Sequence, residues 1–99
     1  MVGIEILVRI SPEKRGEFLQ SFNWLTQLDE LNERRMDSGI FEQVNNPNNF
    51  LWVEHWYDEK SLASYCEDNK FYAMMGAIGV MGQLIHKRAF TIIGEGGDE

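Results

Sequence analysis

Hydrophobic and polar residues alternate strictly at the start of the chain. Val2, Ile4, Ile6, Val8 and Ile10 are separated by Gly3, Glu5, Leu7 and Arg9. Successive side chains of a strand point to opposite faces, so this period of two predicts a strand with one buried face over residues 2–10.

The following segment changes to helical spacing. Ser11-Pro12 is a start signal, because Ser is a favoured N-cap and Pro is tolerated at the first helical position. The helix is expected to reach about Arg34 and to be broken by residues 37–39, the sequence DSG. Its apolar stripe is formed by Phe18, Phe22, Leu25 and Leu28, and its solvated face by Asp29, Glu30, Glu33, Arg34 and Arg35.

An aromatic segment, FLWVEHWY over residues 50–57, lies near the centre of the chain and predicts a further strand. A shorter strand over residues 40–44 and the turn sequence NNPNN precede it, so the two strands are expected to form a hairpin. Alternation places Leu51, Val53 and His55 on one face, which we interpret as core. Trp52, Glu54 and Trp56 lie on the other face, which is either the floor of a pocket or a subunit interface.

Two further helical segments follow. Asp58 is the expected N-cap of a helix that carries Leu62, Tyr65 and Cys66 on one side, and the sequence DNK at 68–70 is expected to break it. Beyond it, Ala73, Gly76, Gly79 and Gly82 recur every three residues. Each interior Gly costs a helix about 1 kcal/mol relative to Ala, so a weak or short helix is expected before a last strand over residues 84–93.

The order β-α-β-β-α-β predicts an α+β, ferredoxin-like fold, in which helices cover one face of a four-stranded antiparallel sheet. Residues 1–93 are expected to form one domain and residues 94–99 a flexible acidic tail. Because two helices would cover only one face, we expect a second copy of the chain to cover the other and form a homodimer.

Composition narrows the class of partner. The chain has 99 residues, a net charge of −7 and no basic stripe, which argues against nucleic acid or an anionic membrane as partner. Its apolar runs are too short to span a membrane. Cys66 is the single cysteine, so no intrachain disulfide can form. These features lead us to expect a soluble, cytoplasmic protein.

Several side chains in and near the aromatic strand could carry chemistry. Glu54 lies between two indoles, and burial would raise its pKa and suit it to accept a proton from a phenol. The alternative is an ion pair with Arg9, Lys87 or Arg88. His55 and His86 could act as neutral bases, but their spacing fits no metal motif, so no metal is expected. Cys66 is interpreted as a small core residue.

Three segments, DSGIF (37–41), VEHWYDEKSLASY (53–65) and NKF (69–71), resemble the antibiotic biosynthesis monooxygenase family. The resemblance implies a dimeric α+β barrel and cofactor-independent oxygenation of a small quinol or phenolic aromatic in an apolar pocket. It also implies that Trp56 lines the pocket at the end of the third strand. Tyr65 stands where some members have a helix His. Met75 stands where haem-degrading members have an iron-ligating His, so no haem is expected.

On this basis His55, Glu54 and Tyr65 are the candidates for proton transfer. The residues expected to contact the substrate are Trp56, Trp52, Tyr72 and Met75. No cofactor is expected, and the expected partners are a second copy and a small apolar or aromatic molecule. The alternative function is a non-catalytic, small-molecule-binding or stress-related dimer of the same fold.

Overall fold

The computed structural model describes residues 1–28 and 34–93. Its elements are, in chain order, β1 (Val2–Ile10), the 3-10 turn η1 (Pro12–Lys14), α1 (Arg15–Leu28), β2 (Arg35–Glu42), β3 (Asn49–Trp56), α2 (Glu59–Cys66), α3 (Asn69–Met81) and β4 (Gly82–Thr91). The expected acidic tail, together with Asp29, Glu30 and Glu33 of the expected helix face, lies outside the described residues.

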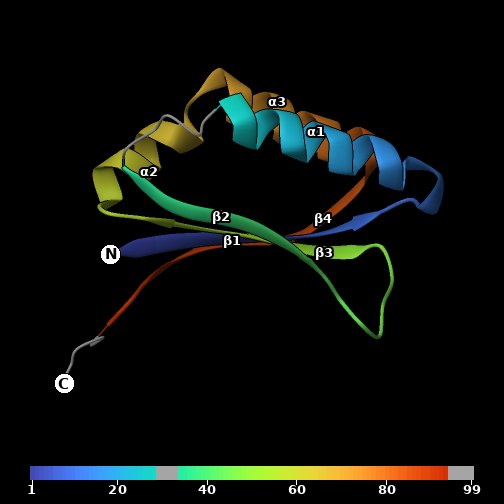
Figure 1. Cartoon of the computed structure of the whole chain (residues 1–99), viewed down its shortest axis with the longest axis horizontal. Helices are drawn as coiled ribbons and strands as arrows, with labels where there is room; N and C mark the ends of the chain where they lie inside the picture. Colours follow the sequence, from blue (N-terminus) through green and yellow to red (C-terminus); the bar gives the residue numbers. More distant parts are fainter. Residues whose placement is uncertain (29–33, 94–99) are drawn as a thin grey trace.

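The four strands form one antiparallel sheet in the order β2-β3-β1-β4. All helices lie on one side of it, and no described element covers the other side (Figure 1). This arrangement confirms the predicted ferredoxin-like fold. We call the uncovered side the open face; it carries Gly3, Glu5, Leu7 and Arg9 of β1 and their neighbours in register on the other strands.

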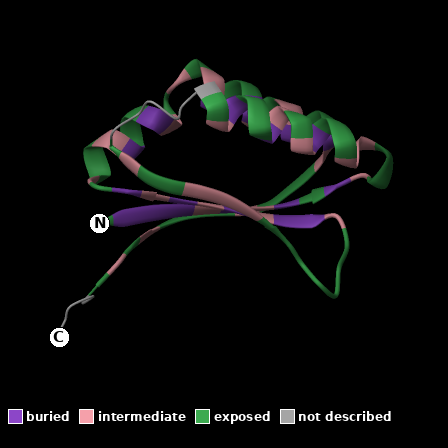
Figure 2. Ribbon diagram, in the orientation of Figure 1, coloured by how far each residue is buried: buried purple, intermediate pink, exposed green. Residues whose placement is uncertain are grey.

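The core lies between the sheet and the helices (Figure 2). The predicted alternation of β1 is confirmed, because Val2, Ile4, Ile6, Val8 and Ile10 are all buried. Four residues of β3 face the same way, namely Phe50, Trp52, Glu54 and Trp56. From the helices, the stripe of Phe18, Phe22 and Leu25 in α1 packs against the sheet, together with buried residues of α2 and α3.

The start signals of the helices are confirmed in position. Ser11 precedes the 3-10 turn, with Pro12 at its first position, although the Ser11 hydroxyl makes no capping hydrogen bond. Asp58 Oδ1 accepts a hydrogen bond from Ser61 N at 2.8 Å and caps α2. Tyr65 and Leu62 then lie on the buried side of that helix, as their spacing predicted.

The expectation of a weak or short helix around the glycine repeat is wrong. α3 has 13 residues, and Asp68 caps it by accepting from Lys70 N at 2.7 Å. Gly76 and Gly79 lie on its exposed side. The buried side is formed by Phe71, Met74, Ile78 and Met81. The burial of this apolar stripe outweighs the low helix propensity of glycine.

The predicted limits of three elements are also wrong. Arg34 lies in a turn, and β2 begins at Arg35, so the predicted helix breaker DSG is part of a strand. Asp37, Ser38 and Gly39 pair with His55, Glu54 and Val53 of β3. Pairing with a long neighbouring strand thus overrides the turn-forming composition. β2 ends at Glu42 and not at residue 44, and β4 spans Gly82–Thr91 and not residues 84–93.

Both edge strands are irregular. The register of β4 against β1 shifts between Leu7 and Val8, and that of β2 against β3 shifts between Arg35 and Asp37. Such shifts bend a strand and increase its twist. Within residues 1–28 and 34–93, no helix has the length and apolar character that a membrane crossing requires.

Candidate functional site

Glu54 of β3 lies at the centre of a polar cluster inside the core. The residues two positions away in a strand share its face, so the indoles of Trp52 and Trp56 flank it. Trp52 Nε1 donates to Glu54 Oε2 at 3.1 Å, and Trp56 Nε1 donates to Oε1 at 3.2 Å. Ser38, its partner in register on β2, donates from Oγ to Oε2 at 2.8 Å. The carboxylate is thereby held by three donors at 0% exposure.

A phenol and a guanidinium complete the cluster. The Tyr65 hydroxyl, from α2, donates to Glu54 Oε2 at 3.4 Å. Arg35 Nη1 lies 3.6 Å from the same oxygen, and the Arg35 side chain is 9% exposed. The expected ion pair of Glu54 with Arg9, Lys87 or Arg88 is therefore wrong. Arg35 was expected on a solvated helix face, but β2 carries it into the core.

The electrostatics of the cluster combine two opposing effects. Burial raises the pKa of the Glu54 carboxyl above its ordinary value of 4.5. The hydrogen bonds from Ser38 and Trp52 and the charge of Arg35 act against that rise. A carboxylate with a raised pKa is a stronger proton acceptor than one at the protein surface.

Aromatic rings connect this cluster to the helices. The ring centroids of Trp56 and Tyr65 are 4.8 Å apart, those of Tyr65 and Phe71 are 5.2 Å apart, and those of Trp52 and Phe71 are 5.8 Å apart. The chain's own helices therefore cover the indole face, so the interpretation of this face as a subunit interface is wrong. The face of Leu51, Val53 and His55, interpreted as core, is the open one.

A cavity of about 290 Å³ lies between α2 and the strands β1 and β4. The apolar part of its lining includes Ile4, Leu62 and Cys66, and its charged members are Glu59, Lys87 and Arg88. Ile4 is the partner of Glu54 in register, so the cavity and the carboxylate lie on adjacent strands of the same face. Lys87 Nζ is 5.5 Å from the centroid of the Phe71 ring. Burial raises the pKa of the Cys66 thiol, and the nearby Lys87 acts against this rise.

The remaining candidates lie elsewhere. His55 is on the open face, where its Nδ1 lies 2.6 Å from Asp37 Oδ1 and its ring contacts Phe90 at 5.9 Å. Tyr72 is 60% exposed on α3, and Met75 is partly buried against the core. The structure thus groups Glu54, Tyr65, Trp52 and Trp56 and separates His55 and Tyr72 from them.

Two residues of the site were not singled out for it from the sequence. Arg35 was not recognised as a site residue, because the helix was predicted to extend too far along the chain. Lys87 was considered only as an ion-pair partner, although its place opposite Ile6 puts it on the helix side of β4. Within the described ranges, no group of three or more His, Cys, Asp or Glu side chains could hold a metal ion.

Comparison of the sequence and the fold with those of known proteins identifies the family of the chain. No family model matches the chain. A Bacillus subtilis (strain 168) protein named "Putative monooxygenase YcnE" is 31% identical over 71 residues, which are 72% of this chain and 75% of that protein.

Solved structures share the fold. A "putative antibiotic biosynthesis monooxygenase" from Deinococcus radiodurans is 18% identical and has a TM-score of 0.86, covering 100% of this chain and 98% of its own. A mutant of SnoaB, a cofactor-independent oxygenase from Streptomyces nogalater, is 12% identical with a TM-score of 0.81, covering 94% and 93%. By its likeness to YcnE and this shared fold, the chain belongs to the antibiotic biosynthesis monooxygenase family.

Proposed function

We propose that the protein is a cofactor-independent monooxygenase that acts on a small quinol or phenolic aromatic. Family membership and the fold shared with SnoaB support a monooxygenase. The observation that carries the proposal is the position of the buried Glu54 cluster beside a largely apolar cavity that also holds a cation, Lys87.

The cavity suits an aromatic ring that becomes an anion. Its apolar lining residues would contact the ring, and the Lys87 ammonium would stabilise negative charge on a phenolic oxygen. A nearby positive charge lowers the pKa of a phenol, so it favours the deprotonated substrate.

Glu54 and Tyr65 are the proposed proton acceptors. Tyr65 does not itself line the cavity, but its neighbours on the same helix, Leu62 and Cys66, do. In the proposal, the Tyr65 oxygen takes the substrate's phenolic proton while its own proton passes to Glu54, to which it is already hydrogen-bonded. Trp52 and Trp56 hold the carboxylate in place and so position the acceptor.

The substrate anion is then the electron donor to O₂. For a substrate with a ring CH₂ activated by the phenolate, the overall reaction is CH₂ + O₂ → C=O + H₂O. O₂ is reduced by four electrons and the ring carbon is oxidised by four. The protein's part is to bind the ring and take up the proton.

Oxygen consumption with a panel of quinols and phenols tests the proposal. The native protein should consume O₂ with at least one of them, and Glu54→Gln and Tyr65→Phe should each lower kcat by about 10²-fold or more. Lys60→Met, which removes an exposed cation of α2, should retain the native rate. The proposal is wrong if no member of the panel is oxidised or if Glu54→Gln keeps full activity.

A second function is supported by the many hydrogen bonds that the Glu54 carboxylate accepts. Glu54 accepts from four side-chain donors and is paired with Arg35, which is also what a purely structural buried acid would show. The protein would then bind a small apolar molecule without turnover. Saturable quenching of tryptophan fluorescence by panel members, with no O₂ consumption, would identify this function.

We further propose that the protein is a homodimer formed through the open face. Phe41 is 62% exposed there, in register with Leu51. Leu7, beside Leu51, and Val53 are only partly buried. A second copy would remove these side chains from water.

A further inference from the structure

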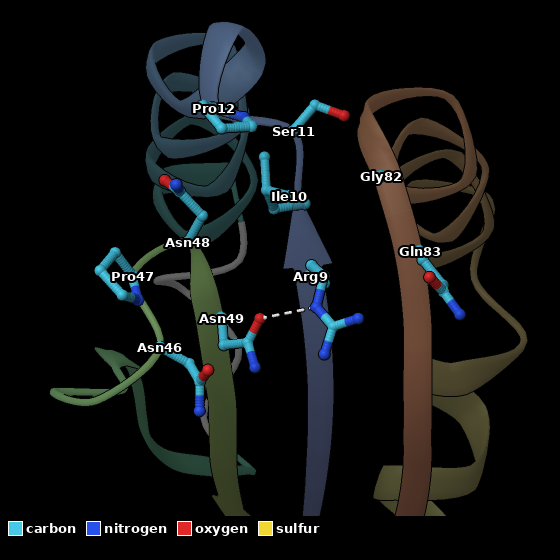
Figure 3. A pocket seen from close by; sticks show the side chains of 10 residues that line it. All are labelled: Arg9, Ile10, Ser11, Pro12, Asn46, Pro47, Asn48, Asn49, Gly82 and Gln83. Carbon is cyan, nitrogen blue, oxygen red and sulfur yellow. Dashed lines mark hydrogen bonds between the residues drawn. The ribbon is translucent and has the colours of Figure 1, made fainter.

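A second cavity, of about 540 Å³, lies at the end of the sheet where β3 begins (Figure 3), whereas Glu54 lies near the other end of β3. It is formed where β1 ends, the β2–β3 turn returns and β4 begins. Its size is within the range of small-molecule sites. Its lining differs from that of the α2 cavity, because it includes the polar side chains of Arg9, Ser11, Asn46, Asn48, Asn49 and Gln83.

Arg9 is one of the residues that line this cavity. In the register of the sheet it lies between Asn49 of β3 and Gln83 of β4, so an amide side chain flanks it on each side (Figure 3). Arg9 Nε donates to Asn49 Oδ1 at 3.1 Å. Within the described residues, no hydrogen bond engages the other two nitrogens of the guanidinium. This pair of nitrogens is the edge that binds a carboxylate with two parallel hydrogen bonds.

The frame around Arg9 is rigidly built. Asn49 is buried, and its Nδ2 donates to Gln43 Oε1 at 3.2 Å, which fixes the amide that orients Arg9. Asn48 has a left-handed backbone with φ of 72°, and its carbonyl accepts from Ile10 N at 2.8 Å. A Cβ on Gly82 would collide with the Arg9 carbonyl oxygen, so only glycine lets β4 approach here. The guanidinium is thus oriented before any ligand arrives.

The charge of the cavity selects the ligand. Among the described residues that line it, Arg9 carries the only charge, in a chain whose net charge is −7. One guanidinium matches a monoanion better than a dianion. Ser11, Asn46 and Gln83 add neutral groups that can hydrogen-bond a hydroxyl.

We propose that this cavity binds a small hydroxycarboxylate, with the carboxylate on the Nη edge of Arg9 and the hydroxyl on the neighbouring amides. The site shares no lining residue with the α2 cavity, so it is independent of the proposed oxygenase chemistry. Arg9 lies at one end of the open face, so the site requires that the proposed dimer contact around Phe41, Leu51 and Leu7 leaves that end accessible.

NMR titration of the whole protein with lactate tests the site. Saturable shifts are expected at Arg9 Nε–H and at the side-chain amides of Asn49 and Gln83. Arg9→Gln should weaken lactate binding by about tenfold or more, because the charged hydrogen bonds are lost. Arg9→Lys should also weaken it, since a lysine keeps the charge but not the two-nitrogen edge. Lys14→Gln, which removes a nearby cation outside the cavity, should bind lactate as the native protein does.

Several outcomes would overturn the proposal. Unchanged lactate affinity in Arg9→Gln would exclude Arg9 as the anchor, and equal weakening in Lys14→Gln would indicate general charge attraction. Shifts of the same size with sodium chloride would show that no carboxylate is recognised. Tighter binding of inorganic phosphate than of lactate would exclude the carboxylate as the preferred anion.

Discussion

Glu54 is an acid that the fold places inside its apolar core. Transfer of a carboxylate from water to such a place is costly unless hydrogen bonds and a counterion compensate. Two indole N–H groups, two hydroxyls and the Arg35 guanidinium supply that compensation. Removal of a single partner therefore leaves an under-satisfied buried group, which is more costly than loss of one surface hydrogen bond.

The raised pKa of Glu54 predicts a specific pH dependence of stability. Above the ordinary pKa of 4.5, the folded protein holds this proton more tightly than the unfolded chain does. Its contribution to the free energy of unfolding is therefore greatest below that pH and falls as pH rises through the folded pKa. Urea unfolding of the native protein and Glu54→Gln, from pH 4 to pH 8, should give a stability difference that shifts in favour of the variant as pH rises.

Glu13→Gln is the control for this measurement, because Glu13 is exposed at the start of the first helical turn. The free energy of unfolding of Glu13→Gln should depend on pH in the same way as that of the native protein over this range. A native-minus-Glu54→Gln difference that stays constant or grows with pH would contradict the raised pKa.

The sequence identified the members of this cluster on β3 but not their arrangement. Alternation correctly placed Trp52, Glu54 and Trp56 on one face. It could not say which face the helices cover, because both sets of side chains in β3 contain large apolar groups. Arg35 was not predicted, since its burial depends on a strand that its local composition does not favour.

At the scale of a single element, α3 shows how tertiary burial outweighs composition. Gly76 and Gly79 lie on its exposed side, and a Cβ at either position would meet no atom within 4 Å beyond its chain neighbours and the adjacent helix backbone. Replacement by Ala therefore adds helix propensity without a steric cost. Each single substitution should raise the free energy of unfolding by about 0.5–1 kcal/mol, measured by urea unfolding.

Gly82→Ala is the contrasting variant. Its Cβ would meet backbone atoms of Arg9 and Ile10, which cannot move aside as a flexible side chain can. It should destabilise the protein where Gly76→Ala and Gly79→Ala stabilise it. If all three substitutions stabilise the protein, or if none does, then helix propensity and steric fit do not determine the effect of Ala at these positions.

The fold could be predicted more fully than the residues at which its helices and strands begin and end. The order of elements follows from periodicity, which spans many residues and tolerates local exceptions. The limits of β2, α3 and β4 depend on pairing with distant segments, as in the contact of Asp37–Gly39 with β3. A sequence read segment by segment does not contain that information.

At the scale of the whole molecule, the open face predicts the state of association. Phe41→Asp would place a charge on the proposed contact surface, where burial is unfavourable for an unpaired carboxylate. Light scattering after size-exclusion chromatography should give a dimer mass for the native protein and a monomer mass for the variant.

Val80→Asp is the matched control, since Val80 is 82% exposed on the helix side of the molecule. It should leave the dimer mass unchanged. A native monomer, or dissociation by Val80→Asp alone, would mean that the open face is not the contact surface.

The register shifts in the two outer strands have a consequence for how copies of this chain can meet. A regular outer strand offers unpaired backbone N–H and C=O groups on which another chain can add a strand, and fibrils grow in that way. Here both borders of the sheet are bent, between Leu7 and Val8 against β4 and between Arg35 and Asp37 against β2. An added strand therefore meets one irregular position at each border, although Asp37–Glu42 of β2 pairs in continuous register. The proposed contact through the open face, by contrast, would close at two copies and would not lead to an open-ended polymer.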